Sequence, residues 1–178
     1  MYIDMLSAEI IKIIKDLREQ QAQVDIRDRK AFLLNMVFVW SVIKASERLL
    51  IEAAAESSGK LKDYYVSHLE EERNHEKWLA EDLKTAGIDV SSIAPIRLAV
   101  ELAGSQYYLI KHHNPASLLG YMAVLEGLPY SIADVELLEK LHGKDLVRTL
   151  RYHAVNDVEH AKDLFNVIDE INSPEIVS

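Results

Sequence analysis

The sequence predicts an all-α protein, and three observations lead to that fold class. Apolar residues recur three and four positions apart over long stretches, as on one face of a helix. Alternating runs of Val, Ile and Thr between tight turns, which would indicate strands, are almost absent. Only 6 Gly and 4 Pro interrupt the 178 residues. We therefore expect one domain over residues 1–178, a compact bundle of about seven helices with short loops.

The first three helices are bounded by the ends of their apolar patterns and by turn residues. We expect the first over 5–23 and the second over 29–57. The third is expected over 60–86 as one continuous helix. It stops at Gly87, a residue suited to the left-handed conformation that often follows a helix.

Proline, glycine and asparagine divide the middle of the chain. A fourth helix opens near Pro95 and ends near His113. Asn114 and Pro115 then fit the N-cap and the first position of a fifth helix. Gly127 and the proline two residues later break it. A short sixth helix follows, and we expect the last helix over residues 144–172.

The composition excludes several classes of protein. There is no cysteine, so disulfides, thiolate metal sites and cysteine nucleophiles are excluded. The net charge of −9 without a basic stripe argues against nucleic acid and anionic membranes as partners. No run of 18 apolar residues predicts a membrane span, and the first residues lack the basic segment of a signal peptide. We therefore expect a cytoplasmic location.

The last helix carries the strongest functional pattern. His153, Asp157 and His160 stand at positions i, i+4 and i+7, within about 60° of one another around the helix. Leu164 and Val167 share or flank that face, which predicts that it is buried. Buried charges without a partner cost several kcal/mol, and a divalent metal would supply the partner. Two imidazoles and a carboxylate suit Fe, Mn or Zn. The alternative is a solvated stripe or a set of hydrogen-bonded core side chains.

Two further segments offer supporting ligands. Glu72 and His75 form an ExxH pair, in which spacing i, i+3 places both on one helix face, with Glu71 and His68 as alternative ligands. Glu126 is a lone carboxylate in the apolar run LLGYMAVLEG, so burial would require a partner for it. The six candidate ligands for two metal ions are Glu72, His75, Glu126, His153, Asp157 and His160. The candidate pocket residues are Trp78, Tyr107 and Tyr121.

These motifs together resemble the heme-oxygenase-like di-iron oxidases and oxygenases. The resemblance rests on the closing HxxxDxxH, the mid-chain Glu126 and the earlier Glu72 and His75. It implies a seven-helix bundle that holds two Fe(II), with Mn as a substitute. One iron would take Glu72, His75 and His153, and the other would take Asp157 and His160 with a bridging Glu126. The implied activity is O2 activation to oxidise a small organic substrate, namely an amino acid, an amine or a fatty acid.

Other interpretations stay open at this point. Ferritin-like di-iron proteins use the pattern Glu, ExxH, Glu, ExxH across four helices. Glu47 or Glu52 would supply the first position of that pattern, but His153 would have no role. A third interpretation is a helical binding protein of the same fold without enzymatic activity or cofactor. For the enzyme we expect a small-molecule substrate and O2 as partners, and a homodimer.

Overall fold

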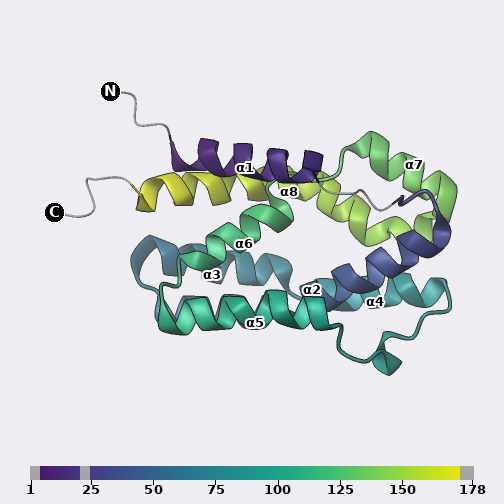
Figure 1. Ribbon diagram of the computed structural model, residues 1–178, viewed down its shortest axis with the longest axis horizontal. Helices are drawn as coiled ribbons and strands as arrows, with labels where there is room; N and C mark the ends of the chain where they lie inside the picture. The colour runs from purple at the N-terminus through teal and green to yellow at the C-terminus, as the bar shows by residue number, and fades with distance from the viewer. Residues whose placement is uncertain (1–4, 21–24, 173–178) are drawn as a thin grey trace.

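The computed structural model describes residues 5–20 and 25–172, and the regular structure in these ranges is helical, without strands. The predicted all-α fold class is therefore confirmed. In chain order, the α-helices of the described residues are α1 (Leu6–Gln20), α2 (Arg29–Glu56), α3 (Gly59–Glu72), α4 (His75–Thr85), α5 (Arg97–His112), α6 (Ser117–Glu126), α7 (Ile132–His142) and α8 (Lys144–Ile171), with a 3₁₀ turn η1 (Val90–Ser92) before α5 (Figure 1).

The two longest helices, α2 and α8, organise the bundle. Helix α2 packs against α3, α4 and α5, whereas α8 packs against α4, α6 and α7. Helix α1 lies along the C-terminal part of α8, where the Ser7 hydroxyl donates a hydrogen bond to Asp169 at 2.6 Å (Figure 1). The fully buried Asp82 of α4 accepts hydrogen bonds from Nε of Arg148 and the backbone N–H of Thr149, both in α8. These bonds hold α4 against α8.

The predicted continuous helix over 60–86 is wrong, because the chain breaks there into two helices. Helix α3 ends at Glu72 and α4 begins at His75. Between them Asn74 has a φ of 71°, in the left-handed region that Asn tolerates better than most residues. The backbone N–H of Asn74 donates to Oε1 of Glu47 in α2 at 2.8 Å. A side chain of another helix therefore supplies a partner for the interrupted backbone.

Other helix ends agree with the sequence or differ from it by a turn. Asn114 and Pro115 do not start α6, which begins at Ser117 with Ala116 as its N-cap. The side-chain oxygen of Asn114 instead accepts a hydrogen bond from the backbone N–H of Ala116 at 2.9 Å, in a turn before the helix. The predicted break at Gly127 is correct, since α6 ends one residue earlier. The expected end of the first helix at residue 23 lies outside the described residues.

The buried apolar residues form two clusters along the bundle. One includes Leu49, Leu50, Tyr65, Leu118, Leu164 and Ile168. The other includes Phe32, Met36, Leu79, Leu83, Val147 and Leu150. Helix α8 contributes to both clusters, and its residues Asp157 and His160 lie between the two contributions. The polar face predicted for the last helix therefore falls where one apolar cluster gives way to the other.

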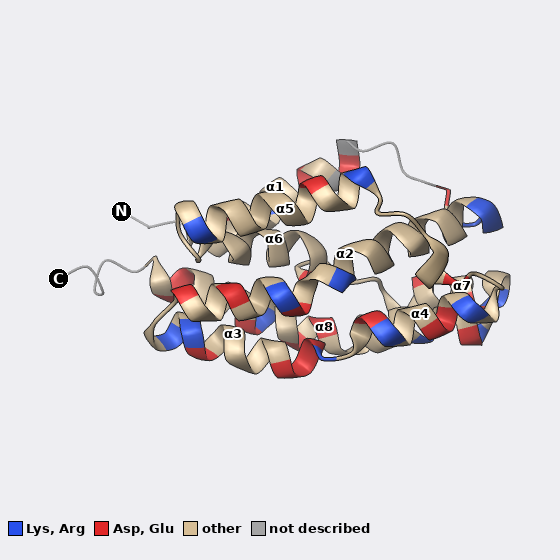
Figure 2. Ribbon diagram, turned by 90° about the horizontal axis from the view of Figure 1, so that it is seen from below, with Lys and Arg blue, Asp and Glu red and all other residues tan. Residues whose placement is uncertain are grey.

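The charged residues are distributed over the outside of the bundle. Lys or Arg and Asp or Glu are interspersed along α3 and α4 in the view of Figure 2. Among the helices of the described ranges, none combines the length and apolarity needed to span a bilayer.

Candidate metal centre

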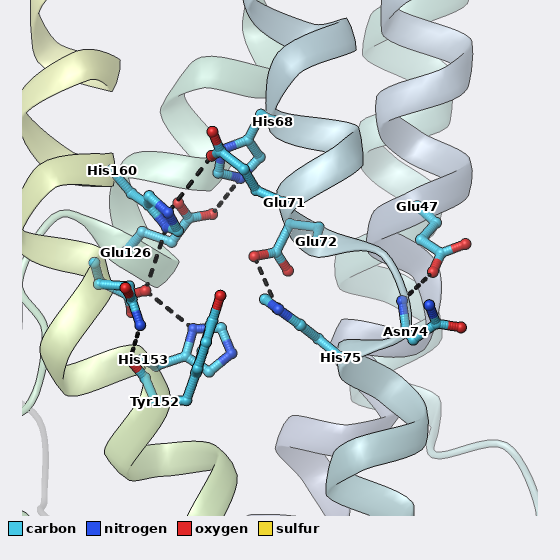
Figure 3. Close-up of polar contacts among 12 residues, drawn as sticks. Glu47, His68, Glu71, Glu72, Asn74, His75, Glu126, Tyr152, His153 and His160 are labelled. Carbon is cyan, nitrogen blue, oxygen red and sulfur yellow. Dashed lines mark hydrogen bonds and ion pairs between the residues drawn. The ribbon is translucent and has the colours of Figure 1, made fainter.

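Carboxylate and imidazole side chains from α3, α4, α6 and α8 lie close together in the bundle (Figure 3). They are His68, Glu71 and Glu72 from α3, His75 from α4, Glu126 from α6, and His153, Asp157 and His160 from α8. We call this set the carboxylate–histidine cluster. It contains all six candidate ligands predicted from the sequence, together with both alternatives, His68 and Glu71. Whether each binds metal stays a prediction.

The first part of the cluster consists of Glu72, His75 and His153. Each offers one ligand atom, and these three atoms lie within 4.8 Å of one another. Nδ1 of His75 lies 3.0 Å from Oε1 of Glu72, close enough for an ion pair but not aligned as a hydrogen bond. The His75 and His153 rings meet edge to face at a centroid distance of 4.9 Å. Three groups from three helices thus surround one point.

The second part consists of His68, Glu71, Glu126 and His160. Nε2 of His68 lies 3.2 Å from Oε1 of Glu126 and forms a hydrogen bond with it. Oε2 of Glu71 lies 3.5 Å both from Nδ1 of His68 and from Nε2 of His160. This part has two imidazoles and two carboxylates, contributed by α3, α6 and α8.

Asp157 joins the two parts. Its Oδ1 accepts a hydrogen bond from Nδ1 of His153 at 3.0 Å and lies 3.5 Å from Nδ1 of His160. The Asp157 side chain is buried and stands one helical turn from each histidine, as the sequence spacing predicted. One carboxylate therefore orients an imidazole on each side of it, which is the usual arrangement around metal-binding histidines.

The pKa values reflect the mutual attraction of these groups. Burial alone would lower the pKa of His68, but the hydrogen bond and charge of Glu126 outweigh it and the pKa lies above the usual value. The same balance, with Asp157 as the partner, raises the pKa of His153. The Asp157 carboxylate is also the main cause that raises the pKa of His160 to about 9. Without a metal, the cluster therefore favours imidazolium rings beside carboxylates.

Two buried carboxylates show the complementary shift. Burial alone would raise the pKa of Asp157, but His153 and His160 outweigh burial and hold it below the usual value. Burial would likewise raise the pKa of Glu72, and the neighbouring His75 and His153 hold it below the usual value. Both carboxylates are thus kept ionised, the state in which a carboxylate binds a metal ion.

Two aromatic rings cover the His75 side of the cluster. The Trp78 ring lies 4.5 Å from the His75 ring, and the Tyr152 ring lies 5.2 Å from it. Trp78 and Tyr152 also contact each other edge to face at 5.1 Å. The prediction that Trp78 lies at the site agrees with this geometry. The sequence analysis did not select Tyr152, although it directly precedes His153.

The other candidate pocket residues lie in different surroundings. Tyr121 is buried and lines a cavity with Glu126, and burial, together with the Glu126 charge, raises its pKa to about 12. Tyr107 instead packs against the first apolar cluster. The sequence analysis also did not select Tyr64, whose ring stacks on His68 at a centroid distance of 5.7 Å.

A cleft of about 750 Å³ leads to the cluster, and we call it the central cleft. Four members of the cluster line it, namely Glu72, Glu126, His153 and Asp157, and the other polar lining residues are Asn35, Ser46, Tyr130, Asp134 and Thr149. Most of the remaining lining is apolar and comes from α2, α6 and α8, including Phe38, Val39, Val42, Ile43, Val124, Leu125 and Leu150. Its described lining residues include no Lys or Arg. An organic molecule in this cleft would contact aliphatic side chains and reach the cluster.

Comparison with known proteins decides the family. A family model described as iron-containing redox enzyme matches residues 39–176. The chain belongs to this family of iron-containing redox enzymes. Its fold is similar to that of a domain of unknown function with a heme oxygenase-like fold from Shewanella denitrificans OS217. The TM-score is 0.78 at 18% identity, over 96% of this chain and 79% of that chain. No curated protein matches the chain.

Several buried ligand atoms of the cluster have no hydrogen-bond partner, as expected for a site that binds iron. In the described residues, Nε2 of His75, Nε2 of His153 and Oε2 of Glu126 are buried without a hydrogen-bond partner. Native proteins leave few buried polar atoms unpaired, because each costs about 1–3 kcal/mol. Imidazole nitrogens and carboxylate oxygens are also the donors that iron accepts in proteins. A metal would satisfy these atoms together.

Within the family fold, the residues of the ferritin-like interpretation have other partners. Glu47 accepts a hydrogen bond from the backbone N–H of Asn74, and Glu52 forms an ion pair with Lys111 at 2.5 Å. His153, which has no role in that interpretation, lies at the centre of the cluster. The geometry therefore favours the ligand set that includes His153.

Proposed function

We propose that this chain is a non-heme di-iron enzyme that uses O2 to oxidise a small, largely apolar organic substrate. The carboxylate–histidine cluster carries the proposal, because its two parts are joined through Asp157 and open on the central cleft. The family membership supports iron and redox chemistry in general. The number of metal ions, the use of O2 and the substrate class belong to the proposal.

The cluster divides into two donor sets. Glu72, His75 and His153 would hold the first metal ion. Glu126, Asp157 and His160 would contribute to the second, and Glu126 is the candidate bridge. Two iron(II) ions held there would supply electrons for the reduction of O2. Mn(II) accepts the same mixture of carboxylate and imidazole donors and is the candidate substitute.

The protein side chains around these donors orient ligands and exclude water. Asp157 fixes the direction of the His153 ring through the hydrogen bond to Nδ1, which leaves Nε2 for the metal. Trp78 and Tyr152 cover the His75 ring on one side. The Tyr121 hydroxyl, buried beside Glu126, is protonated at neutral pH, and its raised pKa keeps it protonated in alkaline solution as well.

The central cleft limits the substrate class. Its lining outside the cluster is mainly aliphatic, so burial of an apolar substrate would provide most of the binding energy. Because no Lys or Arg is found among its described lining residues, a substrate carboxylate would have to be met by the metal ions themselves. A protonated amine head group, in contrast, could pair with carboxylates that line the cleft, such as Asp134. Of the three expected substrate classes, an apolar amine therefore matches the described lining residues best.

The test is iron loading under anaerobic conditions, followed by exposure to O2. We expect the wild-type protein to bind two Fe(II) per chain and then to consume O2. His153→Ala and Glu126→Ala should each lower the iron stoichiometry and abolish the O2 consumption. His113→Ala, at an exposed histidine after α5, is the matched control and should behave like the wild type. Full iron loading and O2 consumption by His153→Ala or Glu126→Ala would contradict the proposal.

A further inference from the structure

We propose that His68 is a direct ligand of the second metal ion, which makes the site a seven-ligand centre with four imidazoles. The sequence analysis named His68, like Glu71, only as an alternative ligand next to the pair Glu72 and His75. The structure places His68 in the cluster together with both members of that pair, so it replaces neither of them. This inference rests on the proposed di-metal function and adds a ligand to it.

His68 is held as a ligand would be, and it is far from the surface. Its side chain is 3% exposed. Tyr64 stacks on the ring with an interplanar angle of 25°, and the His160 ring meets it edge to face at 5.6 Å. These two contacts restrict the ring to the orientation in which Nε2 faces Glu126.

The distance between the two facing atoms suits a shared metal ion. Ligand atoms about 2.1 Å from a metal, with tetrahedral or octahedral angles between them, lie about 3.0–3.4 Å apart. Nε2 of His68 and Oε1 of Glu126 are 3.2 Å apart. A hydrogen bond explains this distance equally well. The assignment of His68 as a ligand therefore rests on the space beside these two atoms and on the partner of its other ring nitrogen.

The space beside His68 has room for an occupant. A cavity of about 20 Å³ is lined by His68, Glu72, Tyr121 and Glu126, with apolar walls from α2 and α6. This volume accepts about one atom of the size of a water molecule. Oε2 of Glu126 and the hydroxyl of the buried Tyr121 are both without a hydrogen-bond partner. An ion at this position would satisfy Oε2 of Glu126, which the protein leaves unpaired.

The other ring nitrogen of His68 has the partner that metal-binding histidines usually have. Nδ1 lies 3.5 Å from Oε2 of Glu71, the same oxygen that lies 3.5 Å from Nε2 of His160. Metal-ligating histidines commonly direct their second ring nitrogen to a carboxylate, which fixes the tautomer and the ring. Glu71 would orient His68 in this way while Nε2 binds the metal.

The inference has a chemical consequence that can be measured without catalysis. With both His68 and His160, the second position gains nitrogen donors, which Co(II) and Zn(II) accept more readily than Mn(II) does. Anaerobic Co(II) titration, followed by visible absorption and by metal analysis, therefore reports on each position without O2 or substrate. We expect the wild-type protein to bind two Co(II) per chain.

Three variants separate the possible roles of His68. His68→Ala should keep the first Co(II) and weaken the second by at least about tenfold, a loss typical of groups that support a metal site. His68→Gln keeps a hydrogen-bond donor near Glu126 but removes the imidazole, and it should be as weak as the alanine variant. His113→Ala is the control for loss of an uninvolved imidazole and should bind both ions as the wild type does.

Each contrary result has a separate meaning. Wild-type affinity in His68→Ala would overturn the inference. Restoration by His68→Gln would also overturn it, because His68 would then only position Glu126. If the wild-type protein bound no second metal ion, the proposed function itself would fail. A measurement on the unmodified protein is independent of variant folding: Co(II)-loaded wild type should show paramagnetically shifted N–H protons from four histidines, and three would contradict the inference.

Discussion

The carboxylate of Glu47 accepts a hydrogen bond from the backbone N–H of Asn74 at 2.8 Å, and this bond links α2 to the break between α3 and α4. The break separates Glu72, the last residue of α3, from His75, the first residue of α4. Their contact at 3.0 Å is therefore made across a change of direction in the chain. The geometry of the first part of the cluster depends on this break.

Replacement of Asn74 tests the backbone conformation at the break. An alanine in the left-handed region costs about 1–2 kcal/mol relative to an ordinary helical conformation, and Asn tolerates that region better. Asn74→Ala should therefore lower the free energy of unfolding by about 1 kcal/mol. Asn74→Gly, which accepts the same φ without strain, should be nearly neutral. Urea denaturation of the metal-free proteins compares the three, and equal stability of the alanine and wild-type proteins would contradict the prediction.

Replacement of Gly127 tests how α6 positions Glu126. A methyl group there would overlap the carbonyl oxygen of Ala123 and approach the ring of Phe165 in α8 to 3.0 Å. Gly127→Ala should thus cost about 1–3 kcal/mol of stability, as overpacking usually does, and should weaken the metal position that Glu126 serves.

Gly120, which lies inside α6, supplies the control. Nothing lies within 4 Å of a methyl group built on Gly120. Gly120→Ala should therefore raise stability by about 0.5–1 kcal/mol, because alanine favours the helix. Denaturation and Co(II) titration measure both variants. Equal effects of the two substitutions would show that space around Gly127 is not limiting.

The stability of the metal-free protein should fall as the pH rises from 6.5 to about 9. The folded protein raises the pKa of His160 from 6.5 to about 9, mainly through Asp157. A group with a raised pKa stabilises the fold fully below its unfolded pKa, and the contribution disappears as the pH passes the folded value. The raised pKa values of His68 and His153 act in the same direction. Denaturation at several pH values measures the slope.

A variant isolates the part of this slope that comes from His160. His160→Gln removes the titrating group and keeps a polar side chain of similar length. Its stability should depend less on pH between 6.5 and 9 than that of the wild type. An unchanged slope would assign the pH dependence to other groups.

Metal binding should show the opposite dependence on pH. The imidazoles must lose their protons before they bind a metal, so binding releases protons. The affinity for Co(II) should therefore increase as the pH approaches about 9, the pKa of His160. Calorimetric titration in buffers of different ionisation enthalpy would count the released protons. Binding without proton release would show that the histidines are not ligands.

The part of the site that could be predicted from the sequence is the part defined by local spacing. His153, Asp157 and His160 share one helix, so the helical period fixes their relative positions. The low exposure of the Glu126 side chain, 13%, agrees with what its apolar neighbours predicted. The all-helical fold followed from long apolar patterns with few glycines and prolines.

The remainder depends on contacts between distant segments. Neither glycine nor proline marks the break after Glu72, and Asn74 is the only local signal. In an uninterrupted helix His68, Glu72 and His75 would share one face at positions i, i+4 and i+7, whereas the break divides them between α3 and α4. Tyr152 stands on α8 beside two rings of α4, a contact that depends on how these helices pack.

The position of Trp78 gives the protein a built-in optical reporter. The chain has two tryptophans, and the other, Trp40, packs in an apolar cluster under Lys44. Trp78 lies 4.5 Å from the His75 ring, at the first metal position. A paramagnetic ion bound there would quench the emission of Trp78 more strongly than that of Trp40. Intrinsic fluorescence therefore follows occupancy of the His75 position directly, without an added dye or label.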